Sequence, residues 1–81
     1  MNNHKSPKNK YRVEMNYGKP LDGIGSATSI TTNSTDENQP HIQHHIDQAK
    51  RNNTTLDVRW LENKKTYPEF EWEEIKKYQF K

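Results

Sequence analysis

The chain contains no cysteine, which excludes disulfide bonds and cysteine-based zinc sites. Apolar residues are also scarce, because hydrophobic side chains make up 27% of the 81 residues and the mean hydropathy is −1.44. A chain this short and polar forms at most one small domain with a small core. With no covalent staple, oligomerisation or a partner is the remaining way to bury more surface.

Long apolar runs are absent as well. No stretch approaches the roughly 20 apolar residues that span a bilayer, and the opening MNNHKSPKNK has no apolar run of the kind found in a signal peptide. We therefore expect a cytoplasmic protein with no membrane partner. Glycine is scarce too, and Gly23-x-Gly25 lacks the third glycine of a dinucleotide-binding loop. No cofactor, catalytic residue or enzymatic activity is predicted.

A dense apolar pattern runs from Leu56 to Trp72 and holds both tryptophans of the chain. Within it, Leu56, Val58 and Trp60 alternate with polar residues, which is the period-two signature of a strand with one buried face. We expect this strand to be central, with Trp60 in the core. The same alternation over Tyr11 to Tyr17 predicts a second strand.

The segments around these strands are polar. Residues 1–9 show no periodicity and are predicted to form a flexible basic arm, followed by a single domain over residues 10–81. Residues 21–38 are rich in Gly, Ser, Thr and Asn, which predicts a polar loop that is mobile over much of Asp22 to Asp36. A strand over Ala27 to Thr32 fits the same segment, because Ile30 shares its parity with Ile24.

A helix is predicted from Gln39 or Pro40 to about Asn52. Ile42, Ile46 and Ala49 fall on one face of it at 100° per residue, so the helix should lie across the sheet.

The end of the chain fits two structures. A hairpin with an odd loop or a bulge would set Val58 opposite Phe70 and Leu56 opposite Trp72. A capping box at Thr66-x-x-Glu69 and acidic residues placed before basic ones instead favour a helix. We predict a combination, in which an extended segment runs to about Phe70 and a short helix runs from about Trp72 to Gln79.

Together these elements predict an α+β fold. It is a small two-layer domain, in which an antiparallel sheet of about three strands packs on one helix, with a short C-terminal helix in addition.

Aromatic and acidic residues gather in the C-terminal segment, where aromatic anchors inside a polar rim are typical of a protein-binding surface. Phe70, Trp72 and Tyr78 fit such anchors, but we favour the assignment of Phe70 and Trp72 to the core, because so small a core needs them. Tyr78 and Phe80 are placed beyond the core. The predicted contact residues are Glu69, Glu71, Glu73, Glu74, Tyr78 and Phe80. The leading hypothesis is a small non-enzymatic interaction or regulatory protein that contacts a protein partner or itself. Its size and composition are common among accessory proteins of bacteria and their mobile elements.

The alternative hypothesis is binding of nucleic acid through the basic arm, since lysine and arginine could track a phosphate backbone. The residues concerned are Lys5, Lys8, Lys10 and Arg12. The net charge of +2 predicts little long-range attraction to a polyanion. His41 and His45 stand one turn apart on the predicted helix, but we favour a solvated histidine-rich flank and predict no metal site.

Overall fold

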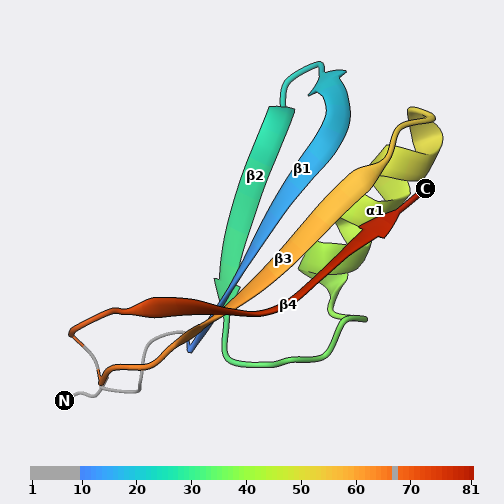
Figure 1. The fold of residues 1–81 in the computed structure, drawn as a ribbon. Helices are drawn as coiled ribbons and strands as arrows, with labels where there is room; N and C mark the ends of the chain where they lie inside the picture. Colours follow the sequence, from blue (N-terminus) through green and yellow to red (C-terminus); the bar gives the residue numbers. More distant parts are fainter. Residues whose placement is uncertain (1–9, 67) are drawn as a thin grey trace, which may run out of the picture.

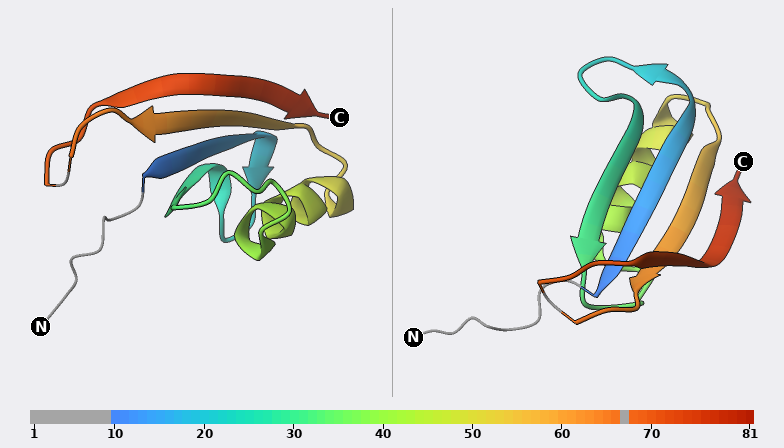
Figure 2. Two further views of the ribbon diagram at one scale, coloured as in Figure 1. Left: turned by 90° about the horizontal axis from the view of Figure 1, so that it is seen from below. Right: turned by 60° about the vertical axis from the view of Figure 1, so that its left-hand side comes forward.

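The structure is a computed structural model that describes residues 10–66 and 68–81. Its elements follow one another as β1 (Tyr11–Leu21), β2 (Gly25–Thr32), α1 (Pro40–Arg51), β3 (Leu56–Asn63) and β4 (Trp72–Phe80) (Figure 1). The four strands form one antiparallel sheet in the order β2-β1-β3-β4. The helix lies on one face of this sheet, and we call the opposite face the open face (Figure 2).

The α+β class, the antiparallel sheet and the helix across it are therefore confirmed. Two details of the prediction are wrong: the sheet has four strands rather than about three, and the described residues contain no C-terminal helix.

The core lies between α1 and the two central strands. In β1, Val13 and Met15 are completely buried and Tyr17 nearly so, which follows from the alternation that predicted this strand. The helix contributes its predicted apolar stripe of Ile42, Ile46 and Ala49, all buried. The predicted helix is thus confirmed in its position and in its buried face.

The segment for which a strand and a loop both fitted the sequence contains β2. Its hairpin turn with β1 includes Gly23 and Gly25, whose φ angles of 79° and 82° lie in the left-handed region that glycine adopts without a steric penalty. Along β2, Ile30 lies opposite Val13 and is partly buried against the core. The thin apolar face that parity predicted is therefore sufficient for an edge strand.

Strand β3 provides the centre of the core, as predicted. Leu56, Val58 and Trp60 are each 0% exposed. The indole Nε1 of Trp60 donates a hydrogen bond of 3.0 Å to the hydroxyl of Tyr78. The ammonium of Lys76 lies 5.6 Å from the centre of the Trp60 ring, a distance at which a cation is attracted to the ring face.

Strand β4 occupies the residues for which a helix was predicted, and its register differs from the hairpin alternative. Leu56 lies opposite Phe80 and Val58 opposite Tyr78, rather than opposite Trp72 and Phe70. The connection between the strands runs from residue 64 to residue 71, which is much longer than the loop that the hairpin prediction assumed.

A β-bulge at Ile75 explains why the pattern of this strand was misread. Trp60 pairs with Lys76 while Leu61 pairs with Glu74, so Ile75 has no residue opposite it. One extra residue inverts the facing of all side chains before it. Trp72 and Glu74 therefore point to the open face, whereas Lys76, Tyr78 and Phe80 point to the face that carries α1. No uniform period of two spans the whole strand.

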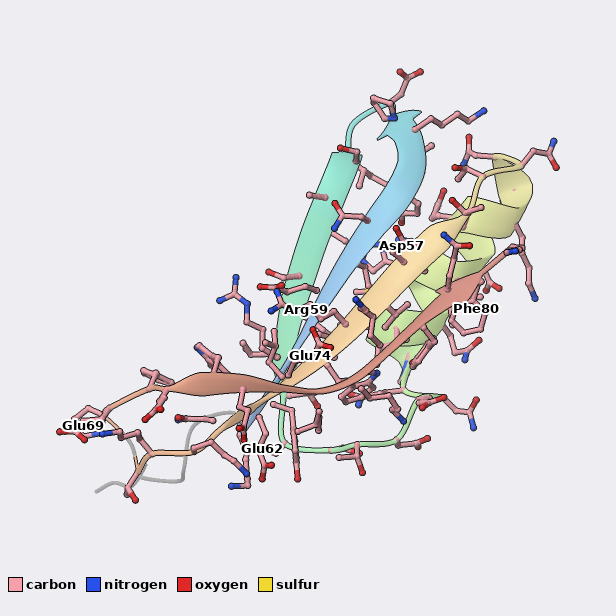
Figure 3. The ribbon with its side chains drawn as sticks, in the orientation of Figure 1. Asp57, Arg59, Glu62, Glu69, Glu74 and Phe80 are labelled. Atoms are coloured by element: carbon pink, nitrogen blue, oxygen red, sulfur yellow. The ribbon has the colours of Figure 1, made fainter. Side chains whose placement is uncertain are left out.

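The open face has a charge network at its centre. Arg59 on β3 donates to Glu14 on β1 and to Glu74 on β4, each at 2.9 Å (Figure 3). These bonds to Glu74 and Glu14 raise the pKa of Arg59. The network joins three adjacent strands on the face opposite α1.

Among the helices of the described part of the chain, none has the length and apolar character needed to cross a membrane.

Candidate functional site

The connection between β3 and β4 is held by Asn63, the last residue of β3. This side chain is only 5% exposed, and its Oδ1 accepts hydrogen bonds from the backbone amides of Lys65 at 3.0 Å and Glu71 at 2.8 Å. Its Nδ2 donates to the carbonyl oxygen of Glu69 at 3.1 Å. A buried amide side chain that satisfies three backbone groups fixes a loop that has few apolar contacts of its own.

Backbone bonds add to this arrangement. The amide of Lys64 donates to the carbonyl of Glu71 at 2.9 Å, and the amide of Glu69 donates to the carbonyl of Thr66 at 2.9 Å. Residues 63–66 and 69–71 are therefore held in a defined arrangement, placed away from α1 at the opposite end of the hairpin from Phe80 (Figure 3).

Residues 69–75, which we call the contact segment, present apolar side chains on this hairpin. The rings of Phe70 and Trp72 are stacked, with centroids 5.6 Å apart and an interplanar angle of 19°. Phe70 is 50% exposed and Ile75 is 45% exposed. The assignment of Phe70 and Trp72 to the core is therefore wrong, because the bulge and the long connection place the contact segment beyond the reach of α1.

The acidic residues of the contact segment are largely matched by cations. Glu71 lies 3.7 Å from the ammonium of Lys65, Glu73 lies 3.5 Å from that of Lys64, and Glu74 bonds to Arg59. The hydrogen bond to Glu62, with a smaller contribution from Glu73, raises the pKa of Lys64. The rim around the exposed aromatic side chains is thus mixed in charge, although the sequence pattern suggested an acidic one.

Tyr78 and Phe80, the other two predicted contact residues, lie elsewhere. Both are partly buried and pack against the core, with their rings edge to face at 5.4 Å between centroids. The expectation that they lie beyond the core does not hold, because β4 continues along β3 as far as Leu56. Their part in binding a partner stays a prediction, but changing them would also disturb the core.

Phe70 and Ile75 were not among the predicted contact residues, and Phe70 was assigned to the core although it also fitted an aromatic anchor. A signal for Ile75 was present, since an isolated isoleucine between acidic and basic neighbours in EEIKK has no apolar companion at strand spacing. For Phe70 the sequence fitted two interpretations, since its acidic neighbours suited an exposed anchor while the small core favoured burial. Its exposure depends on the length of the connection.

The basic residues of the alternative hypothesis are split. Lys5 and Lys8 lie outside the described residues. Lys10 pairs with Glu62 at 3.3 Å and Arg12 with Glu14 at 3.2 Å, so each has an acidic neighbour within the domain. These pairs reduce the positive potential that a phosphate backbone would meet.

The histidines lie along α1. The hydroxyl of Tyr17 and Nδ1 of His45 are 2.6 Å apart, and the rings of His44 and His45 meet edge to face at 5.0 Å. Burial, followed by the nearby His44 and His41, lowers the pKa of His45, while burial raises the pKa of Tyr17. Among the described residues, no group of three or more potential ligands is arranged to hold a metal ion.

No protein-family model, no curated protein and no solved structure matches this chain.

Proposed function

We propose that the protein is a non-enzymatic binding module that acts by protein-protein contact through the contact segment, with a regulatory role. One observation carries this proposal: Phe70 and Ile75, the two exposed large hydrophobic residues of the described chain, both lie in the contact segment. In a chain with so few apolar residues, leaving two of them in water gives up stabilisation that the fold could use. Binding of a partner would bury these two side chains and provide that stabilisation in the complex.

The geometry around them supports the same function. Aromatic side chains with a polar rim are the parts of an interface that contribute most to binding, provided that they are held in place before the partner arrives. Stacking on Trp72 and the bonds made by Asn63 restrict the contact segment in this way. Because Lys64 and Lys65 stand among the glutamates, the partner surface should be apolar with charges of both signs rather than purely basic.

A site-specific crosslinking experiment tests the proposal. A photoreactive phenylalanine analogue at position 70 should form one dominant adduct with a protein of the source cell, whereas the same analogue at Lys77, which is exposed on β4, should not. Substituting Phe70→Ser together with Ile75→Ser should reduce binding of the captured partner at least tenfold, because both apolar contacts are lost.

Two results would contradict the proposal. The first is adduct formation that is equal at positions 70 and 77, or binding unchanged by the double substitution in a protein that melts like the wild type. The second is tight, salt-sensitive binding to DNA or RNA that is lost on removing the charges of Lys5, Lys8, Lys10 and Arg12, which would favour the alternative hypothesis.

A further inference from the structure

The two edges of the sheet are protected very differently. Exposed edge strands invite pairing with another chain, and proteins discourage it with charged side chains, proline or bulges. Strand β4 carries two glutamates, two lysines and the bulge at Ile75. Strand β2, whose sequence is GSATSITT, has no charge and no proline over its eight residues. The β2 edge is thus neutral, regular along its centre, and rich in hydroxyl and β-branched residues.

The direction of the backbone bonds shows which groups of β2 point outward. Next to β3, the amide of Asn63 donates to the carbonyl of Lys10, and the amide of Gly18 donates to the carbonyl of Thr55. Because bonding alternates along an antiparallel strand, the even-numbered residues of β1 bond to β3 and the odd-numbered ones to β2.

The pairing of β1 with β2 then fixes which residues of the edge strand β2 form backbone hydrogen bonds to β1. Met15 lies opposite Thr28 of β2, and Val13 lies opposite Ile30. The backbone groups of Thr28 and Ile30 therefore form hydrogen bonds to β1. The amides and carbonyls of Ala27 and Ser29 therefore point away from the sheet. Both residues are exposed, and no backbone hydrogen bond within residues 10–66 and 68–81 uses these outward groups.

We propose that β2 pairs with β2 of a second copy of this chain, antiparallel about a two-fold axis at Thr28, to form one continuous eight-stranded sheet. Ala27 of each copy would exchange two backbone hydrogen bonds with Ser29 of the other. The two Thr28 side chains would then lie opposite each other, and threonine pairs are favourable across strands.

A second copy fits this edge because the strand is complementary to itself. An antiparallel pair related by a two-fold axis sets each residue against a residue of the same strand, so like charges on the strand would repel each other. The neutral sequence of β2 contains none. Strand β4 is the poorer candidate, because the bulge at Ile75 interrupts the regular row of outward backbone groups that such a strand pair requires.

The first test measures the mass of the protein. Sedimentation from micromolar to millimolar concentration should show the weight-average mass rising from that of a monomer towards that of a dimer, because one strand pair is a small interface. Ser29→Pro removes an outward amide that donates no backbone hydrogen bond within the described residues, so the variant should keep the fold and stay monomeric. Lys77→Pro, at the matching outward position of β4, should dimerise like the wild type. A monomer at every concentration, or an unchanged dimer in a folded Ser29→Pro variant, overturns the proposal.

A second test does not depend on proline. Because the chain has no cysteine, Thr28→Cys introduces one thiol per copy. Residues in a non-hydrogen-bonded pair have Cα atoms about 4.5 Å apart, within the range of about 4.4 to 6.8 Å that a disulfide spans. Mild oxidation should give a covalent dimer of Thr28→Cys at least tenfold faster than of Lys77→Cys, and equal rates would overturn the proposed pairing. The Phe70→Ser and Ile75→Ser substitutions should leave this dimer intact, which separates it from the contact segment.

Discussion

At the scale of single residues, Trp60 carries the largest share of the core. It is completely buried, and its indole nitrogen has a partner in Tyr78. Trp60→Ala should therefore lower the free energy of unfolding by about 3 to 5 kcal/mol, through lost burial and the cavity left behind. Denaturant unfolding monitored by circular dichroism measures this change. Its neighbour Arg59 points to the open face and is the control, since Arg59→Ala should cost much less. An equal loss of unfolding free energy in both variants would mean that the buried and exposed faces of β3 have been assigned wrongly.

His45 makes stability depend on pH. Its lowered pKa means that the folded state prefers the neutral imidazole, whose Nδ1 can accept a hydrogen bond from the Tyr17 hydroxyl. As pH falls through the ordinary value of 6.5, the unfolded chain binds a proton before the folded one does, so stability decreases until the folded state is protonated as well. Melting temperatures between pH 8 and pH 5 should fall for the wild type and fall less for His45→Gln. Parallel curves for the two proteins would show that His45 is not the cause of the pH dependence of stability.

At the scale of elements, the connection between β3 and β4 depends on Asn63. Asn63→Ala leaves three backbone groups of the connection without their partner, which should lower the free energy of unfolding by about 1 to 3 kcal/mol. The amides of Lys65 and Glu71 should then exchange with solvent faster, as hydrogen exchange would show. Asn16→Ala on the open face of β1 is the matched control. Unchanged exchange at Lys65 and Glu71 would show that backbone bonds alone hold the connection.

The elements also differ in how far sequence could predict them. The strand of Leu56, Val58 and Trp60 and the helix of Ile42, Ile46 and Ala49 were predictable, because one buried face imposes one uninterrupted period. β4 was not, because the bulge at Ile75 shifts the period within the strand. The order of acidic and basic residues that favoured a helix there acts weakly, at about 0.3 to 1 kcal/mol for each charge. Burial of Tyr78 and Phe80 on the core and pairing with β3 outweigh it.

At the scale of the whole molecule, the candidate site combines side chains that the sequence alone could not bring together. The sequence indicated the C-terminal segment as a contact surface, but it predicted Glu73 and Glu74 on a helix, and the structure places both on β4. Which aromatic side chains are exposed depends on the register between β3 and β4, and the pairing of Glu74 with Arg59 depends on residues 15 apart in the chain. Lys76 likewise pairs with Glu37, which is 39 residues away, and this bond raises the pKa of Lys76. Contacts of this kind have no local pattern in a sequence.

The bulge at Ile75 also bears on how this protein can change over generations. It divides one strand into a half that completes the core, with Tyr78 and Phe80, and a half that faces away from it, with Trp72 and Glu74. Substitutions in the second half meet solvent and not α1, so natural variation can accumulate there while the first half stays under selection for packing. Descendants of this chain could therefore acquire new specificities at the end of the hairpin while the rest of the fold is inherited unchanged.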